Sequence, residues 1–171
     1  GMCAQTFGFI GTGNMGGAVA RAVRKHLDGE RLLLANRTAS KAEALAQELG
    51  CRTADNETVA ETANFIFLGV KPQMMAALLA ELGPVLARRT NRFILVTMAA
   101  GLTIARIQEL SGGNYPVIRI MPNTPAAIGE GMVLYTCSEG VSPDEEQVFL
   151  EAMSGAGRLS ALSESLMDAG S

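Results

Sequence analysis

Residues 7–17 read FGFIGTGNMGG, and this stretch decides the fold. The uninterrupted apolar run 7–10 is typical of a strand that is covered on both faces. Gly11, Gly13 and Gly16 follow it with the spacing GxGxxG, and apolar residues then recur at helical spacing. In such a unit the first glycine allows a tight turn, the second lets a diphosphate approach the backbone, and the third lets the helix pack closely. The motif therefore predicts dinucleotide binding at the amino end of the first helix.

Short apolar runs alternate with amphipathic segments along the rest of the chain. The expected strands cover 7–10, 32–35, 51–53, 65–68, 93–97, 117–120, 132–135 and 158–162, and the expected helices cover 14–27, 40–49, 57–62, 73–82 and 103–110, followed by a last long helix capped at Ser142. The pair Gly83-Pro84 is expected to interrupt the fourth helix. Alternating strands and helices predict an α/β fold: a Rossmann-like, doubly wound, mainly parallel sheet with helices on both faces.

The end of the second strand indicates which nicotinamide cofactor is bound. An NAD site usually carries Asp or Glu there, whereas this chain has Asn36, Arg37 and Thr38. A carboxylate would repel a 2′-phosphate, while these three side chains can donate hydrogen bonds to it and Lys41 can add charge. The pattern favours NADPH and leaves NADH possible. A local turn with a surface arginine is the structural alternative.

Two further loops follow buried strands and are expected at the same edge of the sheet. Residues 70–73 (VKPQ) follow the fourth strand, and residues 97–101 (TMAAG) follow the fifth. Ligands of open α/β sheets bind at the carboxyl ends of the strands, so both loops are candidates for cofactor contact. Taken alone, each is equally well explained as a plain strand–helix turn.

Length, charge and composition exclude several other classes of protein. With 171 residues the chain has room for one well-packed domain, and its net charge of −3 includes no dense basic block of the kind that nucleic-acid binding needs. The sequence has no apolar run of the ~18 residues that span a membrane. Three scattered cysteines and one histidine predict reduced thiols, a cytoplasmic location and no metal site.

The sequence resembles pyrroline-5-carboxylate reductases, the enzymes of the last step of proline synthesis, over nearly its whole length. The resemblance rests on residues 8–17, 36–38, 70–73 and 99–101, and most specifically on MPNTPAAIGEG at 121–131. It implies reduction of the C=N bond of 1-pyrroline-5-carboxylate, a small-molecule substrate, by NADPH. A stand-alone NADP(H)-binding module without catalysis and a related imine or keto-acid reductase are the alternatives.

The resemblance also implies the site residues. The implied cofactor contacts are Gly11, Thr12, Gly13, Asn14, Met15, Asn36, Arg37, Thr38, Asn56, Val70, Lys71, Pro72, Met98, Ala99 and Ala100. Pro122, Asn123 and Thr124 are implied to border the substrate, although a rigid turn is the structural alternative for that loop. The resemblance assigns no catalytic acid and no metal ligand.

Members of this family continue into an all-helical second domain that forms an interlocked dimer and closes the substrate pocket, so the resemblance implies a homodimer or higher oligomer for the full-length enzyme. We therefore expect a cofactor-binding domain at 2–162, with 163–171 as the start of a missing helical domain. On this expectation the chain is a truncated, proteolysed or natural fragment, and its oligomeric state is open. Such a fragment is expected to bind NADPH but to turn over substrate poorly.

Overall fold

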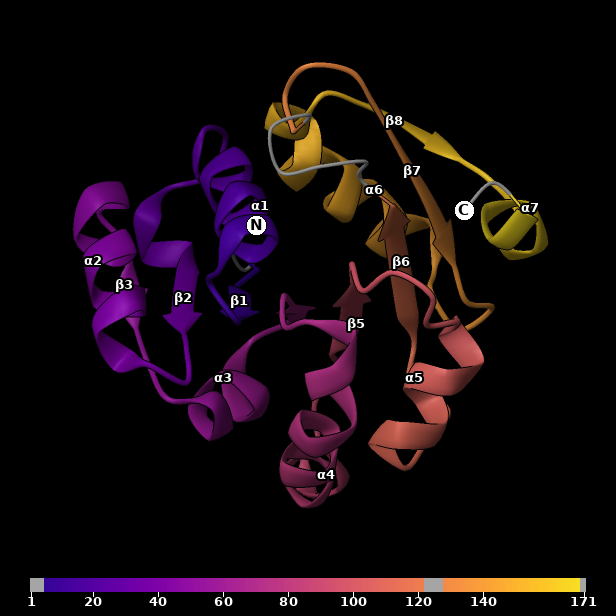
Figure 1. The fold of residues 1–171 in the computed structure, drawn as a ribbon, viewed down its shortest axis with the longest axis horizontal. Helices are drawn as coiled ribbons and strands as arrows, with labels where there is room; N and C mark the ends of the chain where they lie inside the picture. The colour runs from indigo at the N-terminus through magenta and orange to yellow at the C-terminus, as the bar shows by residue number, and fades with distance from the viewer. Residues whose placement is uncertain (1–4, 122–127, 170–171) are drawn as a thin grey trace.

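The computed structural model describes residues 5–121 and 128–169, and one eight-stranded sheet runs through the described part (Figure 1). The strands are β1 (Phe7–Ile10), β2 (Leu32–Ala35), β3 (Arg52–Thr53), β4 (Phe65–Leu68), β5 (Ile94–Thr97), β6 (Val117–Met121), β7 (Met132–Cys137) and β8 (Arg158–Ala161). The α-helices are α1 (Asn14–Arg24), α2 (Ala39–Leu49), α3 (Asn56–Thr62), α4 (Pro72–Arg88), α5 (Ile104–Ser111), α6 (Pro143–Ala152) and α7 (Glu164–Ala169). Two 3₁₀ turns, Gly29–Arg31 and Met153–Ala156, complete the described elements.

The order of the strands places a topological switch beside the glycine motif. The sheet runs β3-β2-β1-β4-β5-β6-β7-β8, and β1 pairs in parallel with both β2 and β4. The chain moves outward in one direction from β1 to β3 and in the other from β4 onward, so a crevice opens at the carboxyl ends of β1 and β4. Only β7 runs antiparallel to its neighbour β6, while β8 is parallel to β7. The predicted mainly parallel, doubly wound sheet is confirmed.

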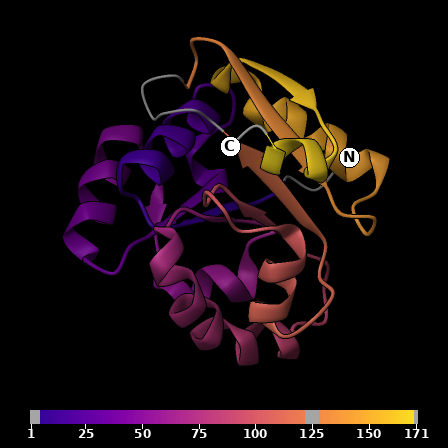
Figure 2. The ribbon, with the colours of Figure 1, turned by 45° about the vertical axis from the view of Figure 1, so that its right-hand side comes forward.

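Two apolar cores, one on each face of the sheet, explain why the strands are apolar throughout. Phe7 and Phe9 point to the face covered by α1, α2 and α6, and Phe7 stacks on Phe65 with ring centroids 5.0 Å apart. Ile10 and Leu68 face the opposite core, which α3, α4 and α5 cover. Figure 2 shows the two layers of helices from a second direction. Because both faces are buried, neither can carry the polar residues that an alternating strand would have.

Helix α4 corrects one expectation, because it runs without interruption through Gly83 and Pro84. Proline inside a helix removes one backbone hydrogen bond and costs ~3 kcal/mol. Leu82, Val85 and Leu86 surround the proline and are all at least 96% buried. Burial of three such side chains contributes more than that cost, at about 1.5–3 kcal/mol each, so tertiary packing keeps the helix intact.

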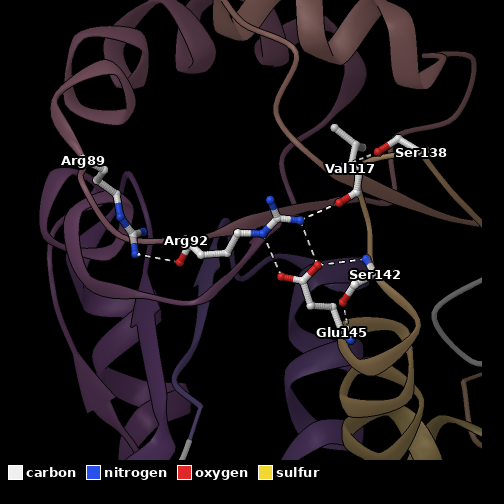
Figure 3. A network of polar contacts seen from close by, with 7 residues as sticks. Arg89, Arg92, Val117, Ser138, Ser142 and Glu145 are labelled. Atoms are coloured by element: carbon white, nitrogen blue, oxygen red, sulfur yellow. Dashed lines mark hydrogen bonds and ion pairs between the residues drawn. The ribbon is translucent and has the colours of Figure 1, made fainter.

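The start of helix α6 is tied to the amino end of β5 by a polar network (Figure 3). Ser142 and Glu145 form the predicted capping box, in which each side chain accepts a hydrogen bond from the other residue's backbone N–H. The Arg92 guanidinium donates two hydrogen bonds of 2.8 Å to the same Glu145 carboxylate. Both hydrogen bonds form only with the carboxylate, so this network depends on pH.

We expect Glu145 to make stability fall in acid. Hydrogen bonding from Arg92 holds the pKa of the Glu145 carboxyl below its ordinary value of 4.5. A lowered folded-state pKa contributes stability above the unfolded value, and this contribution is lost as pH falls through the folded value. Urea unfolding from pH 6 down to about pH 3 should therefore show Glu145→Gln losing less stability than the wild type. The difference should be about 0.5–1 kcal/mol, because Arg92 is 55% exposed and water screens the pair.

Glu139→Gln provides the matched control, since Glu139 is an exposed carboxylate just before the same network. Its acid profile should follow the wild type. Parallel acid profiles for Glu145→Gln and the wild type would contradict the role given to the ion pair.

Candidate functional site

The glycine loop brings the ends of β1 and β4 into direct backbone contact. Gly11 has φ +92° and donates its N–H to the carbonyl of Ala35, 2.9 Å away. Across the crevice, Gly69 donates its N–H to the carbonyl of Ile10 at 2.7 Å. A Cβ atom placed on Gly11 would lie 2.8 Å from the carbonyl carbon of Gly69, so no larger residue fits between the two strands.

Gly16 and Gly69 let helix α1 reach this turn. A Cβ on Gly16 would overlap the carbonyl oxygen of Gly11 and would lie 3.3 Å from the Cα of Gly69. The packing role predicted for Gly16 is thus confirmed. Gly69 was missed by the sequence analysis, although a glycine directly after the apolar run of β4 is the signal that could have found it.

The amino end of α1 fits an anionic diphosphate. Among the described residues no side chain caps this helix, so the N–H groups of Asn14, Met15 and Gly16 have no partner within it. A Cβ on Gly13 would meet no atom of residues 5–121 or 128–169 within 4 Å, which leaves the backbone open on that side. The hydroxyl oxygen of Thr12 is buried and has no hydrogen-bond partner in the described part of the chain. Uncapped N–H groups beside an open glycine are what phosphate recognition requires.

Asn36 braces the glycine loop instead of projecting both amide atoms into the crevice. Its Oδ1 accepts the N–H of Thr12 at 2.9 Å, and its Nδ2 donates to the carbonyl of Thr38 at 3.1 Å. Arg37 and Lys41 are exposed on the same edge, and their charged groups form no ion pair with any described residue. Arg37 and Lys41 therefore supply the positive charge beside the end of β2, while the exposed Lys71 lies at the end of β4.

A groove of about 450 Å³ at the carboxyl edge gathers seven of the predicted residues: Gly11, Gly13, Asn36, Arg37, Asn56, Val70 and Lys71. Helix α4 closes its far wall with Met74, Ala77, Leu78 and Glu81. These four were not predicted, although their spacing i, i+3, i+4, i+7 places them on one helix face. The lining is mixed in character, with the apolar Met74, Ala77 and Leu78 beside the charged Arg37, Lys71 and Glu81, and small-molecule sites commonly combine apolar surface with a few polar groups.

A second hollow of about 500 Å³ lies between α1 and α2 and adjoins the glycine loop. Thr12, Gly13 and Asn14 form one side of it, and Lys41 lies on the other. An ion pair between Arg21 and Glu48 also lines it. Asn14 and Thr12 are thus placed beside the cationic edge.

The remaining predicted residues line neither hollow. Met15, Thr38, Pro72, Met98, Ala99 and Ala100 are absent from both linings, and the predicted substrate residues Pro122, Asn123 and Thr124 lie outside the described residues. Met98 and Ala99 are 8% and 5% exposed. The Ala99 N–H donates to the Thr97 hydroxyl at 3.3 Å, so this loop begins with a local turn.

Asn56 reaches the groove because the residue before it caps a helix. The Asp55 carboxylate accepts the N–H of Thr58 at 2.7 Å, and hydrogen bonding to Thr58 lowers the pKa of Asp55. Helix α3 therefore begins at Asn56, at the mouth of the groove.

Two features are absent from residues 5–121 and 128–169. No helix in these ranges has the length and apolar character needed to cross a membrane. No group of three or more His, Cys, Asp or Glu side chains in the same ranges could hold a metal ion. A further hollow, lined by Asn64, Arg92 and Glu145, lies at the amino ends of the strands, at the opposite edge from the glycine loop.

Comparison with known proteins identifies relatives of this chain. The family described as "NADP oxidoreductase coenzyme F420-dependent" matches residues 6–101. The pyrroline-5-carboxylate reductase of Corynebacterium melassecola is 30% identical over 166 residues, which are 96% of this chain and 62% of that protein.

Two solved structures share the fold. The pyrroline-5-carboxylate reductase of Coxiella burnetii superposes with a TM-score of 0.85 at 26% identity, over 95% of this chain and 60% of that one. An imine reductase from Myxococcus stipitatus in complex with NADP⁺ gives a TM-score of 0.71 at 25% identity, over 96% and 59%. The chain spans about 60% of the length of these relatives. Since the matched family covers the glycine loop, the cationic edge and the groove, the chain belongs to the NADP oxidoreductase, coenzyme F420-dependent, family.

Proposed function

We propose that this chain binds NADPH and forms the cofactor-binding part of an enzyme that reduces 1-pyrroline-5-carboxylate to proline. The observation that carries the proposal is the uncapped amino end of α1 beside the open backbone of Gly13, at the switch between β1 and β4. The likeness to the Corynebacterium melassecola and Coxiella burnetii reductases supports the choice of substrate.

Different residues bind different parts of the cofactor. The N–H groups at the start of α1 bind the diphosphate, and Arg37, Lys41 and the Thr38 hydroxyl bind the 2′-phosphate. The groove between Arg37 and the α4 face takes the adenosine. Val70 and Lys71 also line that groove, and the loop 70–72 leads from it toward the nicotinamide, which the loop 98–100 approaches as well. Pro122, Asn123 and Thr124 border the substrate.

Bound NADPH supplies the hydride for the C=N carbon. A protonated cyclic imine already has an electrophilic carbon, so the protein's main contribution is to hold donor and acceptor in contact. Such positioning supplies about 7–11 kcal/mol of barrier lowering. No described side chain needs to act as an acid, which agrees with the lack of an assigned proton donor.

Titration with NADPH tests the proposal directly. The fluorescence of the bound nicotinamide should change to saturation, and the melting temperature should rise with NADPH concentration because the ligand binds only the folded state. Unchanged fluorescence and melting temperature at high NADPH would refute cofactor binding.

Removal of both cationic side chains should change the preference between cofactors. The double variant Arg37→Ala, Lys41→Ala should bind NADPH about tenfold or more weakly, because each charged hydrogen bond contributes about 1.5–3 kcal/mol at best and exposure reduces it. NADH affinity should stay the same, since NADH has no 2′-phosphate. Isothermal titration with both cofactors measures the change.

Arg158→Ala serves as its control, because Arg158 is exposed on β8, far from the cationic edge in the fold. It should bind both cofactors as the wild type does. Equal loss of NADPH and NADH affinity in the double variant would show that these cations do not read the 2′-phosphate.

Reduction of a different imine is the second candidate, favoured by the likeness to the Myxococcus stipitatus imine reductase. Single-turnover mixtures, with protein in excess over NADPH, detect slow hydride transfer by loss of NADPH absorbance. Faster loss with 1-pyrroline-5-carboxylate than with 2-methyl-1-pyrroline, which lacks the carboxylate, supports the first candidate. The reverse order supports the second.

We also propose a cytoplasmic location and a homodimeric complete enzyme. The thiols of Cys51 and Cys137 are free, which suits a reducing compartment. Burial raises the pKa of both thiols, so they are poor nucleophiles and suit packing more than chemistry.

A further inference from the structure

One carboxylate joins three elements at the carboxyl edge of the sheet. Glu164, the first residue of α7, accepts the backbone N–H of Ile104 at 2.6 Å with its Oε2. The same oxygen accepts a hydrogen bond from Nη1 of Arg119 in β6 at 3.1 Å. Helix α7 is thereby connected to the start of α5 and to the sheet, across 60 and 45 positions of sequence.

The setting of this contact makes it stronger than a surface ion pair. The Arg119 side chain is 1% exposed and that of Glu164 is 27% exposed. A buried guanidinium needs a compensating charge, and loss of one partner of such a pair is costly. Ile104 is 8% exposed, so its N–H also has little access to water as a replacement for Glu164.

The contact fixes the far end of the loop that joins β5 to α5. At its near end, the Ala99 N–H donates to the Thr97 hydroxyl. In its middle, Gly101 has φ +77°, a conformation that side chains rarely adopt. At its far end, the Thr103 hydroxyl caps α5 by accepting the N–H of Arg106 at 3.1 Å, and Glu164 holds the N–H of Ile104. Hydrogen bonds therefore fix both ends of residues 98–103. One of them is accepted by Glu164, which follows the last strand of the sheet.

We propose that Glu164 is a positioning residue for the nicotinamide half of the cofactor. It acts through the loop 98–103 and touches no ligand itself. The inference rests on the proposed function, in which residues 98–100 approach the nicotinamide. It adds that the segment after β8 sets the shape of that half of the site, while the adenosine half, built on α1, β2 and α4, is independent of it.

Two ligands separate this role from a merely structural one. Adenosine 2′,5′-bisphosphate contains only the adenosine half of NADPH, so its affinity reports on the groove and the cationic edge. In Glu164→Ala we expect NADPH to bind about tenfold more weakly, as for the loss of one good polar contact, with bisphosphate affinity unchanged. Glu164→Gln keeps an acceptor for the Ile104 N–H, and it should lose about threefold in NADPH affinity. Isothermal titration of the wild type and of both variants with each ligand gives four ratios of variant to wild-type affinity.

Glu109→Ala is the matched control. Glu109 lies on α5, the helix whose first N–H is bound by Glu164, and it forms an ion pair with Arg106. The Glu109 side chain is 69% exposed. It should leave both affinities unchanged.

Equal weakening of the two ligands in Glu164→Ala, or unchanged NADPH affinity, would overturn the inference. If Glu164→Ala does not fold, the ratio of the two affinities in Glu164→Gln decides in the same way. A wild-type chain that binds neither ligand would instead refute the proposed function, so the two failures are distinguishable.

Discussion

Gly13→Ala should leave the protein folded and weaken NADPH binding by about tenfold or more, with Gly13→Val weaker still. The added Cβ meets no atom of the described residues within 4 Å, so it has space beside them. That space is where a diphosphate would approach the helix, and a methyl group there holds the phosphate away from the N–H groups of α1. Loss of one or two charged hydrogen bonds costs about 1.5–3 kcal/mol each. The cost to stability should be about 0.5–1 kcal/mol, since Gly13 is the N-cap of the helix and alanine is a poorer N-cap residue than glycine.

Titration of NADPH fluorescence and thermal melting together check this result. Gly131→Ala is the control, because a Cβ there also meets no atom of the described part of the chain within 4 Å. Gly131 directly precedes β7, away from the glycine loop. It should bind NADPH normally. Normal binding by Gly13→Val would mean that the diphosphate does not lie on this turn.

Gly16→Ala should destabilise the fold by about 2–4 kcal/mol, in the range of overpacked cores and displaced backbone. The new Cβ overlaps the carbonyl oxygen of Gly11 and crowds the Cα of Gly69. Both neighbours are backbone atoms of residues directly after the paired strands β1 and β4, so neither can rotate away as a side chain could. NADPH affinity should fall as well, because α1 must shift from the turn. Urea unfolding measures the first effect.

Gly17→Ala is a close control one residue along the same helix. Its Cβ would lie 3.3 Å from the carbonyl oxygen of Thr12 and 3.8 Å from a methyl group of Leu45. Slight crowding is offset by the better helix propensity of alanine, worth about 1 kcal/mol. Its stability should stay within about 1 kcal/mol of the wild type. Equal stability of Gly16→Ala and Gly17→Ala would show that the turn is more compliant than the structure indicates.

Local pattern was sufficient for most elements. The four-residue apolar runs at 7–10, 32–35 and 65–68 coincide with β1, β2 and β4, because a strand covered on both faces can be read from its composition alone. The capping box at Ser142 was predictable because its partners are three residues apart. Helix α4 was misjudged at Pro84, where burial of distant side chains outweighs a local cost.

The site was predicted in part, and the omissions share a cause. Gly11, Gly13 and Arg37 carry local signals, and all three line the groove; their contact with the cofactor stays a prediction. Gly69 and the α4 wall were missed because their role depends on what lies across the crevice, which no spacing in the chain records. Sequence did not indicate that the Asn36 amide also hydrogen-bonds to Thr12 and Thr38; its predicted contact with the cofactor stays a prediction.

The sequence by itself determined the strand–loop–helix unit, the order of the elements and the charge at the end of β2, since each depends on residues within one or two turns of each other. Only the tertiary structure decided that Gly69 packs against Gly11 and Gly16, that α4 walls the groove, and that Glu164 holds Arg119 and Ile104. These contacts join residues that are tens of positions apart, and close packing in three dimensions selects them from many pairings that the sequence equally permits.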